Sequence, residues 1–83
     1  VVLPEGSDRA MIADRMQAAG VGTSVHFQPL HTFTWFEKHA EVGAGGTPIA
    51  DATMHRALSL PLHAQIEPAD VDRVCEALAC ALA

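Results

Sequence analysis

The stretch SVHFQPLH, Ser24–His31, decides where a predicted strand ends and the irregular part of the chain begins. The β-branched and aromatic residues of Thr23–Phe27 favour an extended strand. Pro29 ends this strand, because proline has no backbone N–H to donate to a sheet. The segment Leu30–Gly46 then combines aromatic residues with a glycine-rich break. We therefore predict an irregular loop there, with one helical turn at Glu37–Glu41.

A helix is predicted before this stretch, over residues 9–19. Apolar residues recur there with helical spacing at Ile12, Met16 and Ala19. Ser7 or Asp8 can cap the start of this helix. Gly20 can end it, because glycine adopts the left-handed conformation that closes many helices.

Two more helices and two short strands complete the prediction. One helix starts with Pro48 as its first residue and runs to about Ala57, and the other starts at Pro68. The apolar stripe of the last helix consists of Val71, Val74, Cys75, Leu78 and Leu82. The short strands are expected at 1–3 and 58–62. This order predicts one α+β domain over residues 1–83, with a small, mostly antiparallel sheet and helices packed on one face.

Composition and charge exclude several classes of partner. The chain has a net charge of −5 and only five Lys and Arg residues, so it lacks the clustered cations that nucleic acid requires. No apolar run approaches the roughly 20 residues of a membrane span, so no membrane contact is expected. Cys75 and Cys80 lie on one predicted helix in a poor disulfide geometry, which favours reduced thiols and a cytoplasmic protein. A domain this short is marginally stable alone, and the sequence opens without Met, so we expect a fragment that rests against another domain.

Three kinds of reactive site can be weighed from the residues alone. His26 and His31 flank a proline and no Cys-x-x-Cys occurs, so no metal ligand is predicted. Ser24 lies two residues before His26, but the nucleophile-elbow motif of hydrolases is absent. Lys38, the only lysine, lies in a polar turn that does not activate it to form a Schiff base. No catalytic residue is therefore predicted in this chain.

The remaining interpretation is the wall of a pocket. His26 and Gln28 share one face of the predicted strand, and Phe27 faces the other way. His31 follows the turn at Pro29. Imidazole, amide and aromatic groups at a strand end suit a polar ligand with a flat surface. The ordinary polarity of an edge strand explains the same pattern, so both interpretations stay open on the residues alone.

Three motifs, in this order, resemble the C-terminal part of the DegT/DnrJ/StrS-type sugar aminotransferases. The first is Asp8-Arg9 opening a helix that ends in GVGT (Gly20–Thr23), similar to R-x-x-L…L-x-x-x-G-I-x-T. The second is VHFQPLH (Val25–His31), similar to V-H-Y-x-P-L-H. The third is PIA (Pro48–Ala50), then LSLPL (Leu58–Leu62), then Asp70-Val71 and Val74, similar to P-x-A-E…L-S-L-P-L…D-V-x-x-V. Together they cover nearly the whole chain, so the resemblance is specific.

The resemblance implies that the chain is the small C-terminal domain of an aspartate-aminotransferase-like fold. In such enzymes a catalytic large domain carries the Schiff-base lysine and the other groups that hold pyridoxal phosphate. The chain alone is therefore expected to bind no cofactor and to be inactive. The parent reaction would move an amino group, commonly from glutamate, to a nucleotide-linked keto sugar used in polysaccharide or related biosynthesis. The resemblance implies substrate-side contacts for His26 and His31, with Phe27 and Pro29 giving shape. The implied partners are the large domain, the nucleotide-sugar substrate and a second copy, since family members are typically homodimers.

Two departures from the family pattern matter for the site and for the last helix. Phe27 stands where the family usually has Tyr, so any contact by that hydroxyl is lost. Glu67 stands where a Ser or Thr cap is common, which is expected to weaken the start of the last helix. The alternative from a different class is a free-standing, non-catalytic binding or interaction module left from a split gene. Because the face that would meet the large domain is expected to be apolar, we predict that the isolated chain dimerises or aggregates.

Overall fold

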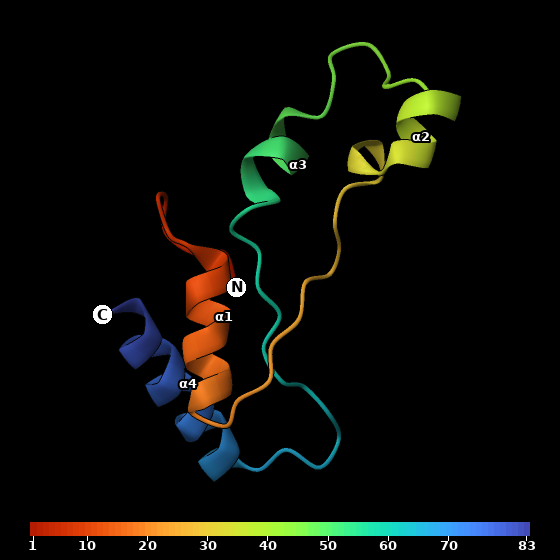
Figure 1. The fold of residues 1–83 in the computed structure, drawn as a ribbon. Coiled ribbons are helices and arrows are strands. Elements are labelled where there is room, and N and C mark those ends of the chain that lie inside the picture. Colours follow the sequence, from red (N-terminus) through yellow and green to blue (C-terminus); the bar gives the residue numbers. More distant parts are fainter.

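The computed structural model describes residues 1–83. Two long helices pack together, and a separate arm, residues 27–55, carries two short helices (Figure 1). The elements in chain order are α1 (Arg9–Ala18), a 3-10 turn η1 (Leu30–Thr32), α2 (Thr34–His39), α3 (Pro48–Thr53) and α4 (Pro68–Leu82). The two long helices, α1 and α4, lie side by side, while η1, α2 and α3 lie at the far end of the arm (Figure 1). None of the helices is long and apolar enough to cross a membrane.

The ends of α1 follow from local sequence. Asp8 caps the helix, since its side chain accepts a hydrogen bond of 3.0 Å from the backbone N–H of Met11. Gly20 follows the helix with a φ of +77°, the left-handed conformation expected of it. This turn sends the chain back along α1, and it seats Val21 in the core.

The core is small and lies between α1, α4 and the two extended segments beside them. Its members are Leu3, Ile12, Met16, Val21, Leu58 and Ala81. Val74, Ala77 and Leu78 of α4 pack against this cluster and are partly buried. The contact stripe of α4 is therefore rotated from the predicted one, since Val71, Cys75 and Leu82 are exposed. The sequence prediction of those three as core residues is wrong.

The predicted antiparallel sheet is absent, which corrects the fold class. The segments expected as strands run beside one another, but they pair only at two isolated antiparallel bridges, Val2 with Ala57 and Ser24 with Ser59. At the second bridge each backbone N–H donates to the other residue's carbonyl, at 3.1 and 2.7 Å. Neither pairing continues into a ladder. Pro4 and Pro61 lie shortly after the paired residues and lack the N–H donors that further rungs require.

The remaining predicted elements are present with changed bounds. The turn expected at 37–41 is the helix α2, which begins three residues earlier, and α3 ends at Thr53 rather than near Ala57. At the start of α4, the carboxylate of Asp70 accepts a hydrogen bond of 3.0 Å from the backbone N–H of Glu67. Asp70 is the third residue of the helix, and its side chain thus bonds the N–H of the residue before the helix. The start of α4 therefore does not depend on a Ser or Thr cap.

The molecule is extended for its length. Its radius of gyration is 15.6 Å, whereas a compact chain of this length is expected at about 12 Å. The arm accounts for the difference, because it places η1, α2 and α3 away from the core (Figure 1). Several large apolar side chains are exposed along it, among them Phe27, Trp35 and Ile49. The arm therefore presents apolar surface that the chain itself does not cover.

Candidate functional site

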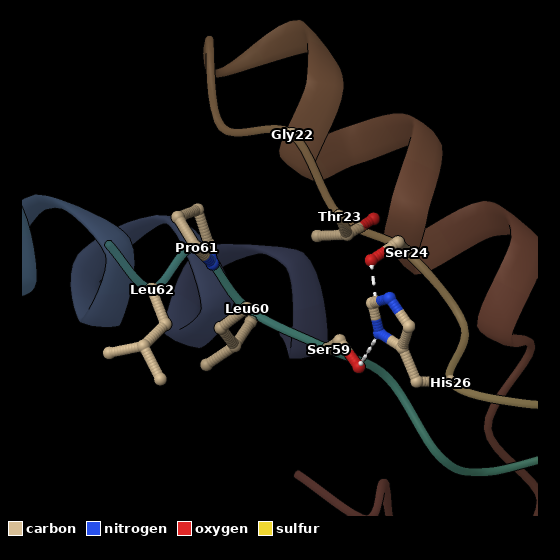
Figure 2. Close-up of a pocket in the computed structure, with 8 residues that line it drawn as sticks. All are labelled: Gly22, Thr23, Ser24, His26, Ser59, Leu60, Pro61 and Leu62. Carbon is tan, nitrogen blue, oxygen red and sulfur yellow. Dashed lines mark hydrogen bonds between the residues drawn. The ribbon is translucent and has the colours of Figure 1, made fainter. Parts of the chain in front are cut away.

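His26 lies in a hollow between the two extended segments (Figure 2). The hollow has a volume of about 710 Å³ and is lined by Gly22, Thr23, Ser24, His26, Ser59, Leu60, Pro61 and Leu62. Ser59 Oγ lies 2.8 Å from His26 Nδ1, and Ser24 Oγ lies 3.4 Å from the same nitrogen. Both hydroxyls therefore contact one nitrogen of the imidazole, as Figure 2 shows. None of the chain's hydrogen bonds involves Nε2, so that nitrogen is available to a ligand.

Phe27 points its ring at His26 and is otherwise exposed. Its ring meets that of His26 edge to face, with centroids 4.8 Å apart and planes at 88°. The side chain is 82% exposed, which is unusual for phenylalanine and leaves its face open to contact by another group. Gln28 bonds within its own turn rather than beside His26. Its Nε2 donates to Thr32 Oγ1 at 2.9 Å, and that hydroxyl donates to the Pro29 carbonyl at 2.7 Å.

His31 and Pro29 lie in a second hollow, on the arm. This hollow has a volume of about 730 Å³ and is formed by η1, α2, the loop after α2 and the start of α3. His31 Nε2 lies 2.6 Å from Asp51 Oδ1 and 3.3 Å from Thr47 Oγ1. The Thr47 hydroxyl also donates to Asp51 Oδ2 at 3.2 Å. The structure thus places the two predicted histidines in different hollows, each with its own polar partners.

Sequence reasoning missed the partners of both histidines. Ser59 comes from a segment 33 positions away from His26 and was expected only as a strand residue. Asp51 lies on α3, and Thr47 comes immediately before that helix. The predicted start of the helix was the only sequence feature that drew attention to either residue. Such pairs depend on how the arm folds back on itself, which short-range sequence patterns do not specify.

A further aromatic pair lies on α2. The rings of Trp35 and His39 stack with centroids 4.5 Å apart and planes at 17°. His39 Nδ1 lies 2.8 Å from the Trp35 carbonyl oxygen, and since a carbonyl only accepts, Nδ1 carries the proton. Trp35 is exposed, so this pair adds to the uncovered surface of the arm.

The residues present do not fit a pyridoxal-phosphate site. Lys38, the only lysine, is exposed on α2 and lines neither hollow. The three arginines with hydrogen bonds to main-chain carbonyls, Arg9, Arg15 and Arg73, are engaged within the fold. No three His, Cys, Asp or Glu side chains gather as metal ligands. We therefore assign no cofactor-holding or metal-holding residue in this chain.

Comparison with known proteins identifies the family. The DegT/DnrJ/EryC1/StrS aminotransferase family matches residues 1–79. The spore coat polysaccharide biosynthesis protein SpsC of Bacillus subtilis (strain 168) is 37% identical over 68 residues, covering 82% of this chain. Uncharacterized protein MJ1066 of Methanocaldococcus jannaschii is 31% identical over 71 residues, covering 86% of this chain. A crystal structure of a DegT DnrJ EryC1 StrS aminotransferase from Brucella abortus matches 89% of this chain with a TM-score of 0.77 and 31% identity. The chain belongs to the DegT/DnrJ/EryC1/StrS aminotransferase family.

The chain covers only part of these relatives. It spans 18% of each of the two proteins and 20% of the solved chain. The resemblance seen in the sequence motifs is confirmed at the level of the family. The roles of His26, Phe27, Pro29 and His31 in substrate binding stay predictions.

Proposed function

We propose that residues 1–83 form the C-terminal small domain of a pyridoxal-phosphate-dependent aminotransferase. The enzyme transfers an amino group from glutamate to a nucleotide-linked keto sugar. The observation that carries the proposal is the match of residues 1–79, nearly the whole chain, to one aminotransferase family. The name of one relative, a spore coat polysaccharide biosynthesis protein, supports a sugar as the amino-group acceptor.

The rest of the enzyme supplies the chemistry in this proposal. The groups that hold the cofactor lie in a large domain outside these 83 residues, since the chain's own lysine lines no hollow. The small core and the uncovered apolar surface of the arm support packing against that domain and against a second copy in a homodimer. The two cysteines are exposed free thiols, which suits a cytoplasmic enzyme.

The chain's own residues contribute to substrate binding in two ways. Ser59 and Ser24 contact Nδ1 of His26 and leave Nε2 free. His26 Nε2 is therefore the ring nitrogen that hydrogen-bonds the substrate. Phe27 offers an exposed ring beside it, and Pro29 shapes the wall of the second hollow that contains His31. These residues bind and orient the sugar nucleotide, and none of them takes part in bond making or breaking.

Replacing His26 tests this role in the complete protein that contains residues 1–83. His26→Ala is expected to raise KM for the nucleotide-linked keto sugar about tenfold, the effect of losing one good hydrogen bond. Amino transfer out of glutamate, measured separately, is expected to stay unchanged. His63→Ala serves as the matched control, since His63 bonds only its own loop. An unchanged KM in the His26 variant would contradict the assigned role, and no amino transfer by the complete protein would favour the free-standing binding module.

Cofactor labelling tests whether the 83 residues act alone. The purified chain is mixed with pyridoxal phosphate, reduced with borohydride and analysed by intact mass. We expect only slow, substoichiometric labelling of Lys38 and the amino terminus, because Lys38 is an exposed amine outside both hollows. Lys38→Arg is the control, and it should remove the Lys38 share and nothing else. A stoichiometric adduct at Lys38 would mean that the chain holds a cofactor site of its own.

A further inference from the structure

Three side chains form a closed polar network at the second hollow, which we call the Thr47–Asp51–His31 network. Asp51 uses both carboxylate oxygens, Oδ1 toward His31 Nε2 at 2.6 Å and Oδ2 toward Thr47 Oγ1 at 3.2 Å. Thr47 Oγ1 and His31 Nε2 are 3.3 Å apart, which completes the triangle. The network joins the turn η1 to α3 across 20 positions of sequence. It is therefore a tertiary contact that fixes where the imidazole lies in the hollow.

The carboxylate of Asp51 determines which groups of the network donate. An ionised carboxylate accepts hydrogen bonds and donates none, so the single proton of the Thr47 hydroxyl goes to Asp51 Oδ2. By the same rule His31 Nε2 must carry a proton, which it donates to Asp51 Oδ1. None of the chain's hydrogen bonds involves Nδ1, so Nδ1 is the ring nitrogen that the network leaves free.

We propose that Asp51, assisted by Thr47, is a positioning residue for His31: it holds the imidazole with Nε2 protonated and bonded to the carboxylate, so that Nδ1 is left free to hydrogen-bond a hydroxyl of the ligand in the second hollow. The proposal rests on the proposed function, in which the ligand is a sugar nucleotide, a molecule rich in hydroxyl donors. Asp51 itself acts through His31 and does not contact the sugar. A carboxylate that accepts a hydrogen bond from one ring nitrogen of a histidine keeps the proton on that nitrogen and fixes the orientation of the ring.

Stability alone does not account for the network. Asp51 is 53% exposed and His31 27% exposed, and polar contacts that are this accessible to water add little to the stability of a fold. The network therefore has little effect on folding but a large effect on which ring nitrogen is free. This difference makes the proposal testable, because Asp51→Ala is expected to leave the fold intact.

A nuclear magnetic resonance experiment on the complete protein that contains residues 1–83 tests the protonation of His31 directly. With 15N-labelled histidine, long-range 1H–15N correlations should show His31 with Nε2 protonated, and the Nε2 proton should be visible because the bond to Asp51 slows its exchange. Asp51→Ala should abolish that proton signal, and Asp51→Glu should restore it. His26 in the same spectrum is the internal control, and its signals should not move. A wild-type His31 with Nε2 unprotonated, or an Nε2 proton signal that persists in Asp51→Ala, would overturn the proposal.

A double-mutant cycle in the complete protein tests the functional consequence. Asp51→Ala is expected to raise KM for the keto-sugar substrate about tenfold with kcat nearly unchanged, and Asp51→Glu to recover most of the loss. In a His31→Ala background, Asp51→Ala should add less than twofold, because the residue that it positions is gone. An equal effect of Asp51→Ala in both backgrounds would overturn the positioning role. Failure of the proposed function would appear differently, as absence of amino transfer to any sugar nucleotide with the spectroscopic result unchanged.

Discussion

Met16→Ala is expected to lower the free energy of unfolding by about 2–5 kcal/mol, the range seen for truncating a fully buried methionine. Met16 is 0% exposed and is the most deeply buried large side chain of the core. A domain of this length has a total stability on the order of 5 kcal/mol. The variant should therefore be largely unfolded, with lost helical signal in circular dichroism and no cooperative transition in urea.

Ile49→Ala is the matched control for this experiment. Ile49 is also a large apolar residue on a helix, but it is 82% exposed, so its truncation should change stability by no more than about 0.5 kcal/mol. Equal losses in the two variants would mean that the six-residue core does not govern the stability of the isolated chain. In that case burial of Ile49 in the predicted dimer would contribute as much as the core does, and the loss in Ile49→Ala would depend on protein concentration.

The long helices were predictable because their signals are local. The capping side chain of Asp8, the left-handed Gly20 and the proline at the first position of α4 each act within a few residues of sequence. Hydrophobic periodicity located the core residues Ile12 and Met16 for the same reason. The predicted stripe of α4 followed its larger apolar residues, whereas the core takes the small residues Ala77 and Ala81. Three of the larger residues, Val71, Cys75 and Leu82, are exposed. The core is too small to cover all of them.

The sheet could not be predicted reliably, because pairing depends on contacts between distant segments. The composition of residues 1–3, 23–27 and 58–62 favours extended backbone, and these segments take part in the two bridges. Composition does not say how many rungs a pairing has, and here each has one. The same limit applies to the site. The motif VHFQPLH pointed to both histidines, but Ser59 and Asp51, which orient them, lie 33 and 20 positions away.

Arg9→Met is expected to destabilise the fold by about 1.5–3 kcal/mol, the contribution of hydrogen bonds from a charged donor. Arg9 Nη1 donates to the carbonyls of Met54 and Ala57, the latter at 3.3 Å, and so ties the start of α1 to the turn after α3. Methionine keeps the apolar stem and removes both donations. Urea unfolding followed by circular dichroism measures the loss.

The effect of Arg9→Met should extend to the site, because the turn that it holds leads directly into Leu58 of the core and Ser59 beside His26. We therefore expect the His26 ring resonances to shift in this variant even where it stays folded. Arg73→Met is the matched control: Arg73 makes one exposed bond of 3.4 Å to the Ala19 carbonyl, so its loss should cost less than about 0.5 kcal/mol and leave His26 unaffected. If Arg9→Met destabilised no more than Arg73→Met, the Asp8-Arg9 motif would owe its place in the family pattern to contacts outside these 83 residues. If it destabilised as expected, the motif would act here by holding the segment that orients His26.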